Sequence, residues 1–507
     1  MPDQTPTQSS ATDIESKNTN SGLSRWLGVG SLVAAATIAA CGSSDDPSGG
    51  TAGSPGNSSA GRPNATAGAG GAAPSFAGAP GTAGSFPSTT GGSPGASGGA
   101  NPGGAGAPVS AGAAGAGGAA GAPVTGSAGS GPVMTGGYPE NTGAACTATA
   151  APLLSKADPI IPNPFAMHDG TIISTKAQWE CRRNEIKKDI EKYEIGTKQE
   201  PPATVKATLS GKTLSVVVTN SAGSLTLTST VSGSGNCVAI GMNGASTILT
   251  GCTQVPFMHD QIVKYGQDST QNKSDPFYKL YPDLFGKIGN YSAWAWGISR
   301  LIDGIEQVKD QLMVDPTKIG VQGCSYAGKM ALFGGAFDER VALTVAEESG
   351  GGGINSWRTS QDFTKRTGTS IEKIDNTNYS WFMSSMKSLD PYSLPHDHHE
   401  LVAMVAPRAF IALGNADYDW LGDESGYKSL LGAIEVYKAL GVADHFGFDF
   451  TSGHAHCSPP AVQTASVKTF ADRFLRGTST TSNVAIKPTS TKFNLSYTLD
   501  WMTPTLQ

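Results

Sequence analysis

The chain has 507 residues and a formal net charge of −6 at pH 7, and 66 of its residues are glycine. The glycine surplus is local, because residues 41–140 hold 30 of these glycines and only four charged side chains. We therefore expect one large domain rather than three or four. The small acidic surplus argues against a nucleic-acid partner or an anionic membrane surface.

The first segment of the chain has the features of an export signal. Lys17 and Arg25 precede a mostly apolar stretch, residues 26–40, which closes with small residues before Cys41. This pattern is typical of a signal peptide, and cysteine at the cleavage point resembles a bacterial lipobox. We expect residues 1–41 to direct export and Cys41 to carry a lipid anchor at the cell envelope or cell surface. Plain secretion behind an ordinary signal peptide is the alternative.

Residues 42–141 consist mainly of Gly, Ala, Ser, Pro and Thr. A segment with so few bulky apolar side chains cannot bury enough surface to offset the entropy of ordering it. We expect a disordered, flexible linker here and a folded domain over residues 142–507. No apolar run of about 20 residues follows residue 41, so we expect no later membrane span and membrane association only through the anchor.

Six cysteines follow Cys41, and an even number in an exported protein suggests disulfides. Their separations suggest the local pairs Cys146–Cys181 and Cys237–Cys252. These two pairs leave Cys324 and Cys457 as a third possible disulfide. Sequence alone does not determine the pairing, and a pair of buried thiols at the last two positions is the alternative.

The first elements of the domain are a helix and a hairpin. Apolar residues at helical spacing among dense charges predict an amphipathic helix over Ala177–Tyr193. Two β-rich runs, Thr213–Thr219 and Ser224–Val231, are separated by four small or polar residues and predict a hairpin. A further helix is expected over Ala293–Gln311.

The rest of the chain alternates short apolar strands with helices. The expected strands are Lys318–Gly323, Val341–Ala346, Ala409–Leu413 and Phe446–Phe450, the expected helices are Lys329–Phe337 and Ser429–Leu440, and Ser490–Leu506 suggests a terminal strand. This alternation predicts an α/β fold with a mostly parallel sheet and helices on both faces. Ligand sites in such sheets lie beyond the carboxyl ends of the strands. Four chemically useful side chains follow strand ends, namely Ser325, Glu348, Asp417 and His456.

Residues Gly323–Gly328 (GCSYAG) resemble a nucleophile elbow, the sharp strand-to-helix turn that exposes a serine. The usual pattern is Gly-x-Ser-x-Gly, whereas Ala327 stands two residues after Ser325 and glycine comes one residue later. A short apolar strand before and a helix after the turn favour the elbow. Ser325 is therefore the candidate nucleophile.

A serine hydroxyl needs an adjacent base to become nucleophilic. His456 is the preferred base, since it follows the last predicted strand, and His454 is its competitor. The acid that orients the imidazole is either Glu348 or Asp417. The segment His396–Glu400 (HDHHE) offers a rival metal site, but it lacks the His-x-x-x-His spacing that puts two imidazoles on one helical face. We expect a structural role for it, and neither a cofactor nor a metal.

Five motifs in order are similar to those of one family, the glucuronoyl esterases of carbohydrate esterase family 15. They are GCSxxGK at 323–329, ESGxGG at 348–353, LPxDHH at 394–399, ADYDWL at 416–421 and GHxHC at 453–457. The similarity spans about residues 142–477. It implies an α/β-hydrolase fold, a three-layer sandwich, and a serine esterase that cleaves esters between 4-O-methyl-glucuronic acid of xylan and alcohols of lignin.

The resemblance also implies roles for residues. Ser325 would be the nucleophile, His456 the base and Glu348 the acid, and members with an acid at the position of Asp417 occur. The disulfide Cys324–Cys457 follows the family pattern. Four further residues match sugar-contacting positions, two clearly and two by a looser alignment: Lys329, Trp420, Glu372 and Asn378.

Two departures from the family pattern stand out. The family usually has arginine directly after the nucleophile, where this chain has Tyr326, and Ser356-Trp357-Arg358 replaces a frequent Cys-Trp-Arg. The backbone N–H of Tyr326 still suits an oxyanion hole, with a second N–H expected from residues 241–244. Loss of the guanidinium favours weak or altered activity. A catalytically inactive carbohydrate binder and an esterase of different selectivity are therefore the alternatives, and we expect a monomer.

Overall fold

The computed structural model describes residues 139–202, 204–482 and 493–507, and the structural statements below concern these residues. The expected export segment with Cys41 lies outside them, as does the linker up to residue 138. Glu140 forms ion pairs with Lys198 and Arg300. The fold therefore extends into the last residues of the segment expected as linker.

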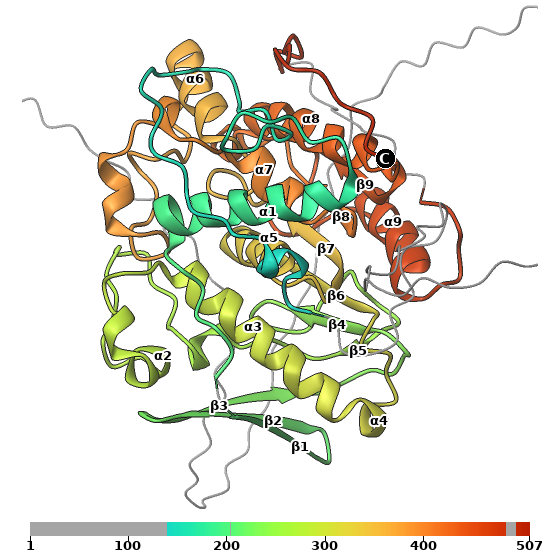
Figure 1. Ribbon diagram of the computed structural model, residues 1–507. Coiled ribbons are helices and arrows are strands. Elements are labelled where there is room, and N and C mark those ends of the chain that lie inside the picture. Colours follow the sequence, from blue (N-terminus) through green and yellow to red (C-terminus); the bar gives the residue numbers. More distant parts are fainter. Residues whose placement is uncertain (1–138, 203, 483–492) are drawn as a thin grey trace, which may run out of the picture. The chain divides into compact units, whose positions relative to one another are not determined.

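A six-stranded parallel sheet forms the centre of the domain (Figure 1). Along the sheet the strand order is β5-β4-β6-β7-β8-β9, and every neighbouring pair runs parallel. The strands are β4 (Val238–Gly241), β5 (Thr253–Gln254), β6 (Ile319–Cys324), β7 (Val341–Glu347), β8 (Ala409–Leu413) and β9 (Phe446–Asp449). The four strands predicted from sequence are confirmed to within one residue at each end. β4 and β5 were not predicted, because runs of four and two residues give no readable pattern.

Both faces of this sheet are covered, as the α/β pattern predicts. Successive side chains of a strand point to opposite faces, and those of β8 divide accordingly between two separate hydrophobic clusters. Phe410 and Ala412 pack with helices α3, α5, α7 and α8, whereas Ile411 and Leu413 pack with Val467 and other residues around α9. The fold is therefore the three-layer α/β sandwich expected from sequence.

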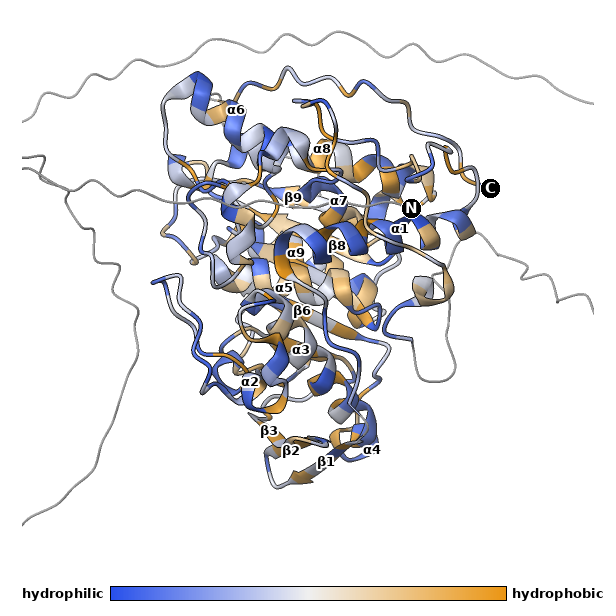
Figure 2. Ribbon diagram, turned by 60° about the vertical axis from the view of Figure 1, so that its left-hand side comes forward, coloured by the Kyte–Doolittle hydropathy of each residue, from blue (hydrophilic) through white to orange (hydrophobic). Residues whose placement is uncertain are grey.

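The helices connect and cover the strands (Figure 1). Figure 2 shows that α1 is largely hydrophilic, whereas the strands of the sheet carry hydrophobic colour. The helices are α1 (Lys176–Ile190), α2 (Pro276–Leu280), α3 (Asn290–Gln307), α4 (Lys309–Leu312), α5 (Tyr326–Phe337), α6 (Trp357–Thr367), α7 (His398–Ala403), α8 (Asp423–Ala439) and α9 (Ala461–Phe470). None of these helices is long and apolar enough to cross a membrane.

A second, antiparallel sheet packs against α3. Its order is β1 (Thr204–Ser210), β2 (Thr213–Asn220) and β3 (Gly223–Thr230), which confirms the predicted hairpin and adds β1. A side chain at Gly304 of α3 would clash with Val216 of β2. Glycine at this position therefore lets the helix approach the small sheet closely.

The C-terminal segment differs from the prediction. The described residues 493–507 form no strand, although they do pack on the domain. Trp501 donates to the carbonyl of Ile161 at 3.2 Å, and the backbone N–H of Gln507 donates to Ser174 at 3.0 Å. The apolar alternation there reflects side chains anchored at intervals, not a hydrogen-bonded ladder.

All three disulfides suggested by the sequence are present. They join Cys146 to Cys181, Cys237 to Cys252 and Cys324 to Cys457. The third connects residues 133 positions apart, at the end of β6 and in the loop after β9. Three disulfides fit a protein of an oxidising compartment.

Candidate active site

The turn between β6 and α5 has the geometry of a nucleophile elbow. Ser325 adopts φ 59° and ψ −126°, a backbone conformation that side-chain-bearing residues rarely take. A Cβ at Gly323 would clash with the carbonyl of Ala327, and a Cβ at Gly328 would clash with the carbonyl of Glu347. The turn thus needs glycine at 323 and 328, so the second required glycine stands one residue later than in Gly-x-Ser-x-Gly.

The carboxyl ends of the central strands bring the predicted residues to one edge of the sheet, as parallel topology requires. A cavity of about 480 Å³ opens there. Its lining includes the candidate nucleophile, oxyanion donor, acid and sugar-contacting residues, namely Ser325, Tyr326, Glu348, Lys329, Glu372, Asn378 and Trp420. Residues separated by about 100 positions in the chain therefore share one pocket.

His456 pairs with Glu348 through its Nδ1 atom. Glu348 is buried and has a positive φ of 41°, while the side chain of His456 is 22% exposed. The backbone N–H of His456 donates to Tyr418 Oη at 3.2 Å, and the imidazole ring centre lies 4.9 Å from that of Trp420. A buried carboxylate on one nitrogen fixes the orientation of the ring.

The Cys324–Cys457 disulfide sets the histidine loop beside the elbow. A ring nitrogen of His456 lies within 4.8 Å of both sulfurs, and Cys324 directly precedes Ser325. Because the sulfurs are bonded to each other, they are not thiolate ligands for a metal. Within the described residues no hydrogen bond joins Ser325 Oγ to His456, and such bonds are often long without substrate.

The two competing residues, Asp417 and His454, have other contacts. Asp417 is exposed, and its carboxylate accepts a hydrogen bond from the backbone N–H of Gly453 at 2.6 Å. His454 Nε2 donates to the carbonyl of Thr451 at 2.8 Å, and its Nδ1 lies 3.6 Å from Glu348. The structure therefore places Glu348, not Asp417, against the imidazole of His456.

Two buried acids behind Glu348 were not found by sequence reasoning. Burial raises the pKa of Glu347 and of Asp423 to about 7, and the charge of Glu348 adds to both shifts. Gln322 Nε2 donates to Glu347 at 2.9 Å. Glu347 and Asp423 therefore take up protons at a higher pH than ordinary carboxyl groups do.

The residues expected to contact a sugar differ in how many contacts they already make within the protein. Lys329 is buried, pairs with Glu372 and lies 5.5 Å above the Trp381 ring. Trp420 is 45% exposed in the cavity wall. Asn378 uses its side-chain oxygen to accept from the backbone N–H groups of residues 380 and 381, at 2.9 and 3.2 Å. Asn378 therefore shapes the pocket wall.

The backbone N–H groups expected to form the oxyanion hole differ in whether they already donate a hydrogen bond within the protein. The first helical hydrogen bond of α5 runs from Lys329 N–H to the carbonyl of Ser325, so the N–H of Tyr326 precedes it and faces no helical acceptor. In the loop after β4, however, Met242 N–H donates to Gln322 and Asn243 N–H to Phe257, each at 2.9 Å. These two groups of the expected 241–244 donor segment are already taken.

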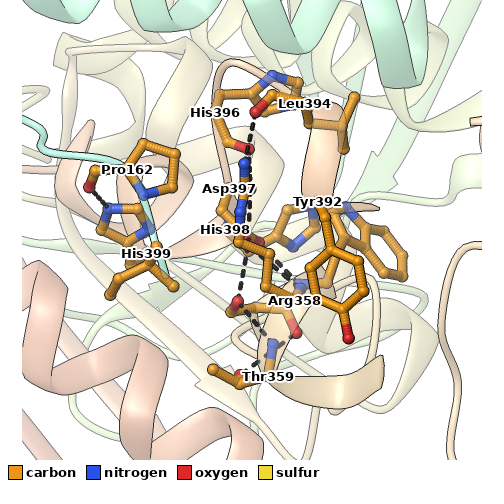
Figure 3. A network of polar contacts seen from close by, with 12 residues as sticks. Pro162, Arg358, Thr359, Tyr392, Leu394, His396, Asp397, His398 and His399 are labelled. Atoms are coloured by element: carbon orange, nitrogen blue, oxygen red, sulfur yellow. Dashed lines mark hydrogen bonds and ion pairs between the residues drawn. The ribbon is translucent and has the colours of Figure 1, made fainter. Parts of the chain in front are cut away.

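The histidine-rich segment is a buried polar network (Figure 3). His396 and His398 each bond Glu194 through Nε2 at 2.8 Å, and all three side chains are fully buried. His399 Nε2 donates to the carbonyl of Pro162, also at 2.8 Å. Every one of these imidazoles has a protein partner, in keeping with the structural role expected for the segment.

The same network involves residues 356–358, where the chain has Ser-Trp-Arg in place of the Cys-Trp-Arg that is frequent in the family it resembles. Ser356 Oγ, which stands where the family often has cysteine, donates to Asp397 at 2.7 Å. Arg358 donates to the carbonyls of Leu394 and His396 and forms an ion pair with Asp397 at 3.2 Å (Figure 3). Hydrogen bonds thus join this segment to α7 without a disulfide.

An elbow serine, a histidine–glutamate pair beyond a parallel sheet and helices on both faces define the class of the protein, a serine-type carboxylic ester hydrolase of the α/β-hydrolase fold. The family model described as "Glucuronyl esterase, fungi" matches residues 206–441. The chain is 35% identical to the 4-O-methyl-glucuronoyl methylesterase of Hypocrea jecorina, over 72% of this chain and 80% of the relative. It is 36% identical to that of Schizophyllum commune, over 71% and 94%. The chain belongs to the glucuronoyl esterase family.

Solved structures agree with this assignment. The catalytic domain of the glucuronoyl esterase from Hypocrea jecorina superposes with a TM-score of 0.64 at 35% identity, covering 69% of this chain and 98% of that one. A serine-to-alanine mutant glucuronoyl esterase from Sporotrichum thermophile, in complex with methyl 4-O-methyl-β-D-glucopyranuronate, gives 0.62 at 34% identity, with 68% and 95% covered.

Proposed function

We propose that this protein hydrolyses esters of 4-O-methyl-glucuronic acid, the linkage between xylan and lignin alcohols, through an acyl-enzyme on Ser325. The observation that carries the proposal is the shared cavity. In this cavity the elbow serine shares one pocket with a buried lysine, its half-buried glutamate partner and an exposed tryptophan, which suit the hydroxyls and the ring face of a sugar. The ligand in the Sporotrichum thermophile structure is itself a methyl ester of this acid.

In the proposed mechanism, His456 accepts the proton of Ser325 as its oxygen attacks the ester carbonyl. Glu348 holds Nδ1 and stabilises the imidazolium, and the N–H of Tyr326 donates to the oxyanion. The C–O bond to the alcohol breaks as His456 returns the proton to the leaving oxygen. Water, activated by the same histidine, then hydrolyses the acyl-enzyme and releases the glucuronate.

The proposed binding residues act on the sugar. Lys329 donates to ring hydroxyls while Glu372 accepts from them, and Trp420 offers a ring face beside His456. Asn378 contributes by holding the turn that carries Trp381. Asp417 accepts a hydrogen bond from the N–H of Gly453 and so holds the loop that carries His456.

We further propose that the domain, residues 142–507 with the few residues that precede it in the fold, is exported as a monomer. Cys41 would carry a lipid anchor, and the linker of residues 42–141 would give a reach of roughly 50–60 Å for a flexible chain of that length. Such a reach suits an anchored enzyme that acts on insoluble plant wall. Mass spectrometry of the mature N-terminus for acylation of Cys41 tests the anchor.

Hydrolysis of the benzyl ester of 4-O-methyl-glucuronic acid, followed by chromatography of the released benzyl alcohol, tests the proposed function. We expect turnover by the wild type and loss of that turnover in Ser325→Ala. Benzyl acetate serves as the selectivity control, and equal rates on both esters would favour a general esterase. Binding to glucuronoxylan without Ser325-dependent turnover of any ester would identify the inactive binder and contradict the proposal.

A further inference from the structure

The charges around the cavity that holds the elbow serine are unevenly matched. Among the described residues that line this cavity, Lys329 is the only cationic side chain, whereas Glu348 and Glu372 are both acids. Lys329 pairs with one carboxylate oxygen of Glu372, and Thr377 Oγ1 donates to the other oxygen at 2.6 Å. The lysine–glutamate pair is therefore held at both carboxylate oxygens, and its two charges cancel.

The position directly after the nucleophile adds no positive charge. Tyr326 occupies it and lines the same cavity. Burial raises the pKa of Tyr326 to about 12, so its phenol is uncharged at neutral pH. Its ring centre lies 4.1 Å from that of Tyr265 and 6.0 Å from that of Trp381. An uncharged aromatic cluster therefore stands where the family usually has arginine.

Glu348 supplies the charge that remains. It pairs with His456, which is neutral when it acts as a base, so this pair carries one negative charge. Burial, and after it the charge of Glu348, raise the pKa values of Glu347 and Asp423 to about 7. At neutral pH both acids are partly ionised and add to the negative charge near Glu348.

Ester hydrolysis changes the charge of the ligand in this cavity. The ester is neutral at its reacting carbon, whereas the acid that leaves has a carboxyl pKa of about 4 and is ionised at neutral pH. The new carboxylate forms at the carbon that was bonded to Ser325, in the cavity that Glu348 lines. Like charges repel, and more strongly at a partly buried site than in bulk water.

We propose that the cavity binds the neutral ester in preference to the uronic acid that the reaction yields, and that Tyr326 and the Lys329–Glu372 pair set this preference. The inference rests on the proposed hydrolysis of glucuronoyl esters and adds a consequence for it, which is weak inhibition by the product. On a polymer with many such groups, the acids already freed then compete little with the remaining esters.

Two ligands that differ only at the reacting carbon test this inference, 4-O-methyl-glucuronic acid and its primary amide. The amide keeps the sugar and the carbonyl group but carries no charge. Calorimetric titration of the full chain with Ser325→Ala, which lacks the nucleophile, measures both dissociation constants. At low salt we expect the acid to bind about tenfold more weakly than the amide. This ratio should shrink at high salt, because ions screen the repulsion.

Two further variants should remove the preference, and a third should keep it. Tyr326→Arg adds a cation to the cavity, and Glu372→Gln leaves the charge of Lys329 unpaired. Each should bring the ratio of the two dissociation constants to about one or below. Tyr326→Gln replaces the ring by another uncharged side chain and should keep the wild-type ratio. Because both ligands carry the same sugar, lost sugar contacts cancel in the ratio.

An acid that binds as tightly as the amide, a ratio that grows at high salt, or a ratio that neither charge variant changes would each overturn the inference. Failure of both ligands to bind would overturn it too. When the wild type hydrolyses the benzyl ester in a Ser325-dependent way, such results defeat this inference alone. Absence of that turnover defeats the proposed function whatever the ratio, because the titration does not depend on turnover.

Discussion

Two histidine–glutamate pairs in this molecule have the same chemistry and different uses. His398 is fully buried, and it bonds Glu194 through Nε2 at 2.8 Å and the carbonyl of Gly353 through Nδ1 at 2.6 Å. His456 bonds Glu348 through Nδ1, and within the described residues no side chain or carbonyl bonds its other nitrogen. A histidine with both nitrogens engaged has none left to accept a proton, so only the second pair can act as a base.

The buried pair nevertheless supports the reactive one. Glu194 accepts from His396, His398 and Trp357, and His398 donates to Gly353 in the loop that begins at Glu348. One pair therefore holds the loop that positions the acid of the other. We expect changes at the first pair to affect stability and changes at the second to affect turnover.

The largest effect is expected for Glu348→Gln. Replacing the carboxylate that orients a catalytic histidine favours the wrong tautomer, and kcat should fall by about 10³- to 10⁴-fold. Steady-state hydrolysis of the benzyl glucuronate ester measures this loss. A fully active Glu348→Gln together with an inactive Asp417→Asn would transfer the role of the acid to Asp417.

His398→Leu should act on stability instead. The variant leaves the buried Glu194 with two of its three donors, His396 and Trp357, so the free energy of unfolding should fall by up to about 3–5 kcal/mol. Denaturant unfolding monitored by tryptophan fluorescence measures the change, and kcat below the unfolding transition should stay near wild type. Wild-type stability with lost turnover would reverse the assignment of the two pairs.

The same variant has a pH signature. Glu194 raises the pKa of His398 against the effect of burial. A histidine whose pKa is raised on folding stabilises the folded protein fully at pH values below its pKa in the unfolded chain, about 6.5. This stabilisation is lost as the pH rises through the pKa of the folded state. The stability gap between wild type and His398→Leu should therefore narrow above neutral pH. A gap that widens there would contradict the ion-pair account.

Asp423→Asn should give a smaller, pH-dependent effect. The folded-state pKa of Asp423 is about 7 against an ordinary 3.8, so its neutral form stabilises the fold fully below about 4 and progressively less toward pH 7. The free energy of unfolding of the wild type should fall over that range more steeply than that of the variant. Asp310→Asn, at an exposed aspartate, is the control that should keep the wild-type slope. Parallel curves for Asp423→Asn and wild type would contradict the neutral-acid assignment.

The smallest effect is expected for Asp417→Asn. Its carboxylate holds the backbone N–H of Gly453, three residues before His456, and an amide oxygen can still accept that bond. We expect kcat to fall by no more than about fivefold, since a charge-assisted hydrogen bond becomes a neutral one. A loss as large as that of Glu348→Gln would show that both carboxylates serve the imidazole.

The sequence predicted the parts of the site that depend on strand ends and local motifs. Ser325, Glu348 and His456 follow apolar strands whose parallel order brings their ends together, and the cysteine separations suggested all three disulfides. Strand β5 has two residues and no pattern to read. The terminal strand was wrong because alternation there reflects isolated anchoring contacts.

Other features depended on tertiary burial and were beyond a single sequence. Glu347 and Asp423 are separated by 76 positions and become neutral acids only because the fold buries them near Glu348. His259 meets Tyr326 from a loop 67 positions away. The choice between Glu348 and Asp417, which both follow strands, also required the observed contact with His456.

The central claim, that Ser325 is the nucleophile served by the His456–Glu348 pair, is tested most directly with an alkyl fluorophosphonate. Its phosphorus forms a bond to an activated serine oxygen as fluoride leaves, and intact-mass and peptide mass spectrometry locate the adduct. We predict a single adduct on Ser325, formed much more slowly in Glu348→Gln and at the wild-type rate in His398→Leu below its unfolding transition. An adduct on another residue, or equal rates in wild type and Glu348→Gln, would contradict the account.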